Sequence, residues 1–184
     1  MTRFRMTLPA ALLAAGLALL PAGVAAGWSW TSSKLPEGGE EVRATTVQNR
    51  VAVSIACLPG TGPTVFQVEI AGAQLPYLAY IANTQESLIF RFGEGGGQAG
   101  RFDGWADVWY SAGDRVWRGG LYLEPEALDA FGGASVMRIL NSFGQEVARF
   151  DMVGSRLSEQ AMRAICHRGM TTQQWVSELT SQTR

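Results

Sequence analysis

Residues 105–123 read WADVWYSAGDRVWRGGLYL, and they contain the strongest β-hairpin signal in the chain. Side chains alternate in character on both sides of Gly113-Asp114, which suits a two-residue turn with glycine at its first central position. With that turn, Trp109 faces Arg118 on the opposite strand, and opposed residues share one face of a sheet. The stretch therefore predicts two antiparallel strands in a defined register.

The two faces of this hairpin differ in character. One face is apolar and predicts core, with Ala106, Val108, Tyr110, Trp117 and Leu121. The other combines aromatic and charged side chains, namely Trp105, Asp107, Trp109, Arg118 and Tyr122. Tryptophan and tyrosine give large rigid contact areas, and arginine can stack on an aromatic ring, so this face is a candidate binding surface for a sugar or a protein. The alternative is that both faces are buried, this one beneath the final helix, because tryptophans are mostly buried.

Short alternating segments separated by turns recur along the chain. Further strands are predicted at 42–58, 64–70, 87–92, 134–140 and 147–152. Helices are predicted at 124–131, from a cap at Ser155 or Ser158 to about His167 with Leu157, Ala161, Ala164 and Ile165 as its apolar stripe, and around Trp175 and Leu179. This order predicts a mainly β chain: one β-sandwich-like or open-barrel domain at 42–184 with closing helices, preceded by a flexible arm at 27–41.

The first 26 residues have the layout of a secretory signal peptide. Arg3 and Arg5 precede an apolar run at 8–20, and small residues follow up to Ala26. The pattern predicts cleavage after Ala26 and a periplasmic or secreted protein without a stable membrane span after processing. The alternative is an uncleaved N-terminal anchor, although the apolar run is short for a span.

Cys57 and Cys166 are the only cysteines, and both follow the leader. An isolated pair in an oxidising compartment usually becomes a disulfide, so we predict that the two are bonded. The alternatives are a metal pair or a catalytic thiol assisted by His167. Neighbouring residues on a helix point about 100° apart, which disfavours a nucleophile–base pair between Cys166 and His167.

The composition excludes several classes of partner. The chain has 184 residues, with 15 Lys and Arg against 16 Asp and Glu, so its net charge of −1 offers no general attraction to nucleic acid or anionic lipid. A glycine-rich motif, Gly95-x-Gly97-x-x-Gly100, matches the dinucleotide fingerprint. That fingerprint requires a helix after it, whereas a strand is predicted there, so no cofactor is expected.

Residues for catalysis are sparse. His167 is the only histidine, so a catalytic triad or a histidine-based metal site lacks partners and no metal is predicted. Its expected role is at a helix C-terminus, where it favours the macrodipole or bonds a last carbonyl. Five carboxylates lie close in sequence: Asp103, Asp107, Glu124, Glu126 and Asp129. They could supply a glycosidase-like acid–base pair or be solvated surface acids.

The order of segments in the second half of the chain carries a resemblance. It runs from Phe90-Arg91-Phe92 through Trp105 and Leu121-Tyr122-Leu123 to the strand at 136–140 and the pattern Phe150-Asp151-x-x-Gly154-Ser155-x5-Ala161-x4-Cys166. This order is similar to two groups of small exported proteobacterial domains: the invasion-associated locus B type and the VasI-type accessory periplasmic protein of type VI secretion clusters. The resemblance implies a β-rich body followed by a strand, a glycine-containing turn and a helix, and it implies no catalytic residues.

Together these observations predict a non-catalytic periplasmic binding or accessory protein of an envelope or secretion process, stabilised by a disulfide. The expected partner is a protein or a cell-envelope glycan. Two alternatives stay open. One is a cell-envelope hydrolase that uses Asp or Glu residues near the Trp-rich hairpin, and the other is an inhibitor or chaperone of another exported protein.

Overall fold

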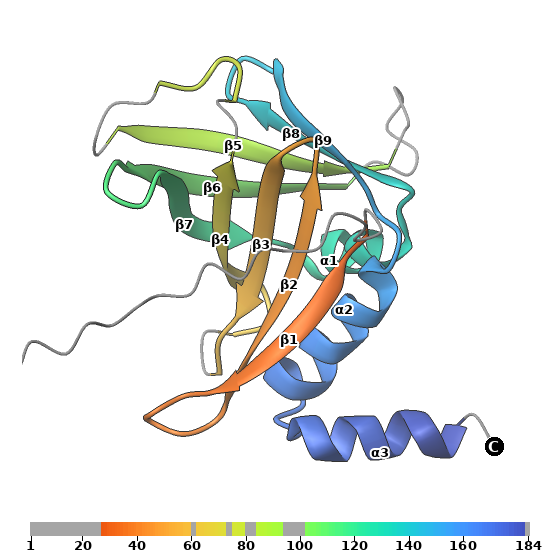
Figure 1. Ribbon diagram of the computed structural model, residues 1–184. Coiled ribbons are helices and arrows are strands. Elements are labelled where there is room, and N and C mark those ends of the chain that lie inside the picture. Colours follow the sequence, from red (N-terminus) through yellow and green to blue (C-terminus); the bar gives the residue numbers. More distant parts are fainter. Residues whose placement is uncertain (1–26, 60–61, 73–74, 80–83, 94–101, 183–184) are drawn as a thin grey trace, which may run out of the picture.

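The computed structural model describes residues 27–59, 62–72, 75–79, 84–93 and 102–182. Within these ranges the chain is mainly β, with nine strands in one sheet and three α-helices (Figure 1). The strands are β1 (Ser29–Lys34), β2 (Glu40–Gln48), β3 (Val51–Cys57), β4 (Val65–Gly72), β5 (Gln85–Phe92), β6 (Phe102–Ser111), β7 (Val116–Tyr122), β8 (Val136–Asn141) and β9 (Glu146–Asp151). The helices are α1 (Pro125–Gly133), α2 (Ser155–Met162) and α3 (Thr172–Gln182), and a π-helical turn, η1 (Arg163–His167), directly follows α2.

The sheet is a single curled layer. Its strand order is β1-β2-β3-β4-β7-β6-β5-β8-β9, and each neighbouring pair is antiparallel. Strands β1 to β4 form one meander. Strands β5 to β7 form a second meander, which joins β4 through β7, and the β8–β9 hairpin extends this second meander at β5. The curl makes a half-barrel (Figure 1), which is the open-barrel form of the two predicted architectures.

The core occupies the concave side of this sheet. Helix α1 contacts β5 and β6, α2 contacts β1 and β2, and the two helices pack on each other, so together they bridge the two arms of the curl. Phe131 of α1 lies at the centre of this packing. Its ring centroid is 4.9 Å from that of Trp28 and 6.1 Å from that of Phe92, and both contacts are edge-on, which is a favoured aromatic geometry.

The predicted disulfide between Cys57 and Cys166 is present. It joins the end of β3 to η1 across 109 residues of sequence and so ties the closing helices to the sheet. Helix α3 has its own attachment, because the Thr172 N–H and hydroxyl both donate to the carboxylate of Glu40 on β2.

The hairpin register predicted for β6 and β7 is confirmed, including the pairing of Trp109 with Arg118. The turn differs from the prediction. The ladder ends at the pair of Ser111 and Val116, and the residue with a left-handed backbone is Arg115, at φ 58°, rather than the glycine. The turn therefore has four residues instead of two. The longer turn removes only the predicted pair nearest to it, and the remaining pairs keep the predicted register.

Residues 27–41, predicted as a flexible arm, contain a paired strand. Residues 29–34 are β1, which pairs with β2 from Ser29 opposite Thr45 to Lys34 opposite Glu40. Trp28 directly before the strand is 5% exposed. The side chains of this edge strand are mostly exposed, and so no alternation in the sequence marks it.

The start of α2 also differs from the prediction. Gly154, at φ 85°, precedes the helix, and no side chain caps its first turn. The Ser155 hydroxyl instead donates to the carbonyl oxygen of Met152 at 2.7 Å.

The predicted apolar stripe is largely confirmed, because Ala161, Ala164 and Ile165 are buried. Leu157 is the exception: it is 53% exposed, and Ser158 is fully buried instead. The buried side of α2 is the side that packs on α1 and on the sheet.

Candidate binding face

The five predicted surface residues lie together on the convex side of β6 and β7. Trp105, Trp109 and Tyr122 are 54%, 45% and 41% exposed, and Asp107 and Arg118 are exposed beside them. The alternative, burial of this face beneath the final helix, is wrong. Helices α1 and α2 pack on the opposite side of the sheet, α1 against β5 and β6 and α2 against β1 and β2, and the apolar face of the hairpin belongs to the core on that side.

Strand β4 adds a third strand to this surface. It pairs with β7, so outward side chains of β4, β7 and β6 form rows across the sheet. The three rows are Val65–Tyr122–Trp105, Gln67–Gly120–Asp107 and Glu69–Arg118–Trp109. We call these nine residues the convex face. The β4 members were not among the predicted surface residues, although Gln67 and Glu69 alternate with apolar residues and so were identifiable as outward-facing.

A furrow crosses the middle of the convex face at Gly120. A Cβ atom built at this position meets no atom within 4 Å, and the backbone of Gly120 does not adopt a left-handed conformation. The rows on either side carry bulky side chains, of which Tyr122 and Arg118 are four residues apart on β7. That separation is about 13 Å along a strand, so the missing side chain leaves an open channel between two walls.

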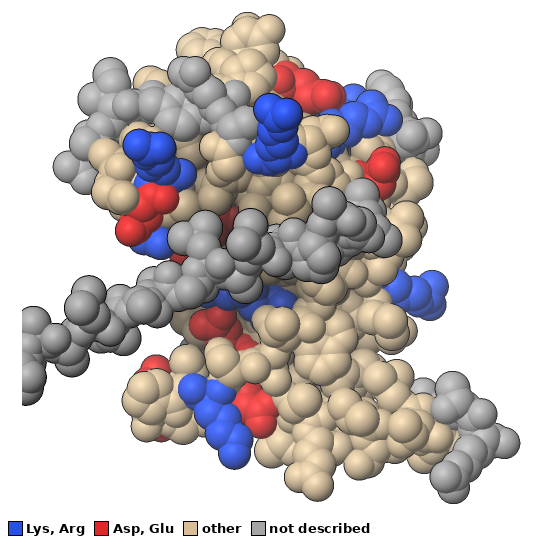
Figure 2. All heavy atoms as spheres, viewed as in Figure 1, with Lys and Arg blue, Asp and Glu red and all other residues tan. Residues whose placement is uncertain are grey.

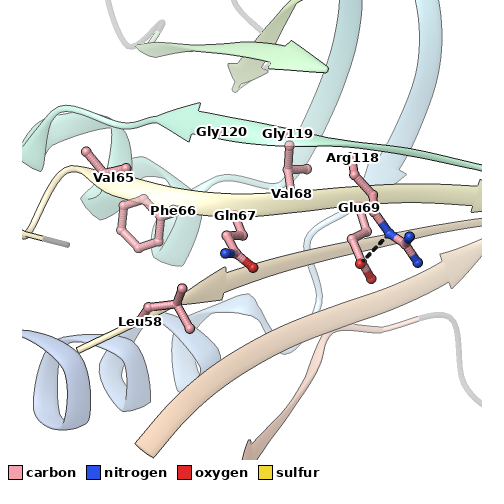
Figure 3. Close-up of a pocket in the computed structure, with 9 residues that line it drawn as sticks. All are labelled: Leu58, Val65, Phe66, Gln67, Val68, Glu69, Arg118, Gly119 and Gly120. Atoms are coloured by element: carbon pink, nitrogen blue, oxygen red, sulfur yellow. Dashed lines mark hydrogen bonds and ion pairs between the residues drawn. The ribbon is translucent and has the colours of Figure 1, made fainter. Parts of the chain in front are cut away.

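Two hollows meet at this furrow. One, of about 440 Å³, lies over β4 and β7, and Figure 3 shows Gln67 and Glu69 projecting from β4 on the same side of it. The other, of about 270 Å³, lies over β7 and β6. The second is lined by Trp105, Asp107 and Tyr122 among others, and both hollows share Val65 and Gly120. The furrow therefore continues across three strands.

A chain of alternating charges forms one wall of the furrow. Arg118 Nε donates to Glu69 Oε1 at 2.9 Å, and Arg43 donates to Glu69 Oε2 at 3.0 Å (Figure 3 shows the first of these). Arg43 lies on β2 and reaches β4 across β3, because the intervening outward residues Ser54 and Ala56 are small. Glu41, which pairs with Arg43, and Asp114, which pairs with Arg118, are the two end members of this series of charges.

Contacts on the convex face shift the pKa values of Arg118, Asp114 and Tyr122. The hydrogen bond with Asp114 raises the pKa of Arg118, and the bond with Glu69 adds to this. The same bond from Arg118 lowers the pKa of Asp114. Tyr122 has a raised pKa because its hydroxyl donates to Glu124 Oε1 at 3.0 Å. The guanidinium of Arg118, expected to stack on Trp109, is thus held by two carboxylates.

Several polar groups of the furrow keep hydrogen-bonding capacity. Asp107 Oδ1 accepts a bond from the Ser87 hydroxyl at 2.7 Å, and within the described residues its second oxygen has no partner. The side-chain amide of Gln67 makes no hydrogen bond to any other described residue, and the same holds for the indole N–H groups of Trp105 and Trp109. The furrow can therefore both donate and accept hydrogen bonds toward a ligand.

Three of the five carboxylates considered for hydrolysis are bonded to three different partners. Asp103 receives two bonds from Arg91, at 2.9 and 3.0 Å. Glu124 accepts from Tyr122, and Asp129 on α1 pairs with Arg163 beyond α2. In the ranges that the structure covers, no three His, Cys, Asp or Glu side chains cluster as metal ligands would. The glycine-rich motif at 95–100 lies outside the described residues.

His167 differs from its expected role at the helix end. Its ring packs against Phe66, with centroids 6.2 Å apart, and its Nε2 is buried without a hydrogen-bond partner. Burial, and then the positive charge of Arg163, lower the pKa of His167 below 6.5. The neutral imidazole is therefore favoured, and the ring contributes packing rather than a positive charge at the helix terminus.

No family model, curated protein or solved structure matches this chain. The resemblance to small exported domains stays a prediction. Among the described residues, no helix has the length and apolar content needed to span a membrane. Function therefore has to be argued from the convex face itself.

Proposed function

We propose that this protein is a non-catalytic binding module of the cell envelope and that the convex face is its binding surface. The observation that carries the proposal is the exposure of Trp105, Trp109 and Tyr122 around an open furrow. Exposed clusters of large aromatic side chains are uncommon on proteins without partners, and tryptophan and tyrosine dominate binding energies at interfaces.

An envelope location is supported by two features of different kinds. The layout of residues 1–26 is that of a secretory signal peptide. The disulfide between Cys57 and Cys166 suits an oxidising compartment such as the periplasm. The resemblance to exported accessory domains agrees with both, and we therefore propose an accessory role in an envelope or secretion process.

The proposal is tested by retention of envelope material on the exported protein. The wild type, a Trp105→Ala/Trp109→Ala double variant and a Phe143→Ala control are immobilised and exposed to a periplasmic extract and to isolated cell wall. Phe143 is a matched control because it is 87% exposed but lies in the β8–β9 turn, away from the convex face.

We expect the wild type and the Phe143→Ala control to retain the same material and the double variant to lose it. Equal retention by all three proteins, or none by the wild type, would remove the convex face as a binding surface. Thermal unfolding of each variant shows whether a loss of retention reflects a loss of fold.

A further inference from the structure

We infer that the ligand of the convex face is a neutral oligosaccharide chain that crosses β4, β7 and β6 along the furrow at Gly120. This inference rests on the proposed function and names its ligand class. It is carried by three properties of the furrow: its direction across the strands, the chemistry of its lining and the neutralisation of its arginines.

The direction of the furrow disfavours a peptide bound as an added strand. Strand addition requires a free sheet edge, whereas β4, β7 and β6 each have a paired neighbour on both sides. The furrow runs across these three strands, over a width of about 10 Å at the usual strand spacing. A rod-like ligand that lies over the strands, such as a short oligosaccharide, fits this direction.

The lining of the furrow suits a pyranose ring. Such a ring presents apolar C–H faces and a rim of hydroxyl groups. Trp105 and Tyr122, directly opposite each other on β6 and β7, offer exposed aromatic surface for the C–H faces. Gln67 and Asp107 lie on the two sides of Gly120 and offer an amide and a carboxylate oxygen for the hydroxyls. A few polar groups among aromatic side chains are typical of small-ligand sites.

The charges of the convex face disfavour a polyanion. Arg43 and Arg118 are each held by two carboxylates, and their chain contains three acids, Glu41, Glu69 and Asp114. Asp107 adds a further negative charge at the furrow. Over the side of the molecule seen in Figure 2, acidic and basic side chains are likewise interspersed rather than gathered by sign. An uncharged ligand rich in hydroxyl donors complements such a lining better than a phosphate or a sulfated glycan.

Gly120 provides a direct test of the furrow. A Gly120→Val substitution fills the channel without backbone strain, since the position is open and its φ is not left-handed. Gly113→Val is the matched control, because a Cβ at Gly113 also meets no atom within 4 Å and that residue lies in the β6–β7 turn. Trp105→Ala removes an aromatic surface without filling the channel.

The experiment titrates the exported wild type and these three variants with cellotetraose, tetra-N-acetylchitotetraose and maltotetraose, with heparin as the polyanionic probe. Calorimetry measures the affinity of each protein for each probe. We expect at least one neutral tetrasaccharide to bind the wild type and Gly113→Val equally. Gly120→Val and Trp105→Ala are expected to weaken it at least about tenfold, and heparin is expected not to bind.

The remaining outcomes separate this inference from the proposed function. If no tetrasaccharide binds at millimolar concentration, or if Gly120→Val binds like the wild type, the inference is overturned. Tighter binding of heparin than of the tetrasaccharides also overturns it. The proposed function survives each of these results if Trp105 and Trp109 are still required for the retention of envelope material.

Discussion

The side-chain amide of Gln48 forms two hydrogen bonds with the backbone of Asp151, in the way that the backbone of a residue on a neighbouring strand does. Its Nε2 donates to the Asp151 carbonyl oxygen at 2.8 Å, and its Oε1 accepts from the Asp151 N–H at 2.8 Å. Gln48 ends β2, Asp151 ends β9, and 103 residues separate them. Beside this pair, the Trp28 N–H donates to the Val153 carbonyl oxygen at 2.7 Å. The two arms of the half-barrel are thus joined at one end by hydrogen bonds.

Gln48→Ala is expected to destabilise the protein by about 1–2 kcal/mol, because two backbone groups of Asp151 lose their partners at a partly buried site. Urea unfolding measures the change. Gln67→Ala is the matched control, since the side chain of Gln67 is exposed and makes no hydrogen bond to other described residues. Equal unfolding midpoints for the two variants would contradict a stabilising role for the Gln48 pair.

Adjacent glycines on β7 are expected to respond oppositely to alanine. A Cβ at Gly119 would lie 1.8 Å from the Asp107 carbonyl oxygen, whereas a Cβ at Gly120 meets nothing within 4 Å. Gly119→Ala should therefore lower the free energy of unfolding by about 3 kcal/mol or more, since β6 and β7 must separate. Gly120→Ala should leave it nearly unchanged. Thermal unfolding of both variants decides, and similar melting temperatures would count against the close approach of the two strands.

Loss of the disulfide is expected to cost about 4 kcal/mol, because Cys57 and Cys166 close a loop of 109 residues. A Cys57→Ala/Cys166→Ala double variant and the reduced wild type should unfold at similarly lowered urea concentrations. Intact mass with and without reduction, after alkylation, counts the free thiols directly. Two thiols alkylated without prior reduction would show that the bond does not form in the protein.

His167 should make stability depend on pH near neutrality. Its pKa is lowered in the folded protein, so the unfolded chain binds a proton more readily below about pH 6.5. The stabilising contribution is present above this pH and is lost as the pH falls through the folded-state pKa. Between about pH 7.5 and about pH 5.5, the wild type should lose more stability than His167→Gln. Parallel pH profiles for the two proteins would assign the acid sensitivity to other groups.

Much of the local structure was predictable because its causes are local. Alternation on both sides of the turn is enough to place Trp109 opposite Arg118, and a change in turn type did not alter that register. The cysteine pair was predictable for a different reason, since the predicted export and an even number of cysteines leave few other states for Cys57 and Cys166. The edge strand β1 was missed because its exposed side chains carry no periodic signal.

The sequence alone was sufficient for the mainly β class, the hairpin with its two chemically distinct faces and the disulfide, because each depends on residue types within a short segment or on a simple count. The tertiary structure alone revealed the pairing of β4 with β7, the furrow at Gly120 that crosses β4, β7 and β6, and the link from Gln48 to Asp151. These features join segments about 50 to 100 residues apart, and the packing of the whole core selects such pairings. Exposure of the aromatic face has the same origin: the helices cover one side of the sheet, and only the assembled fold specifies which.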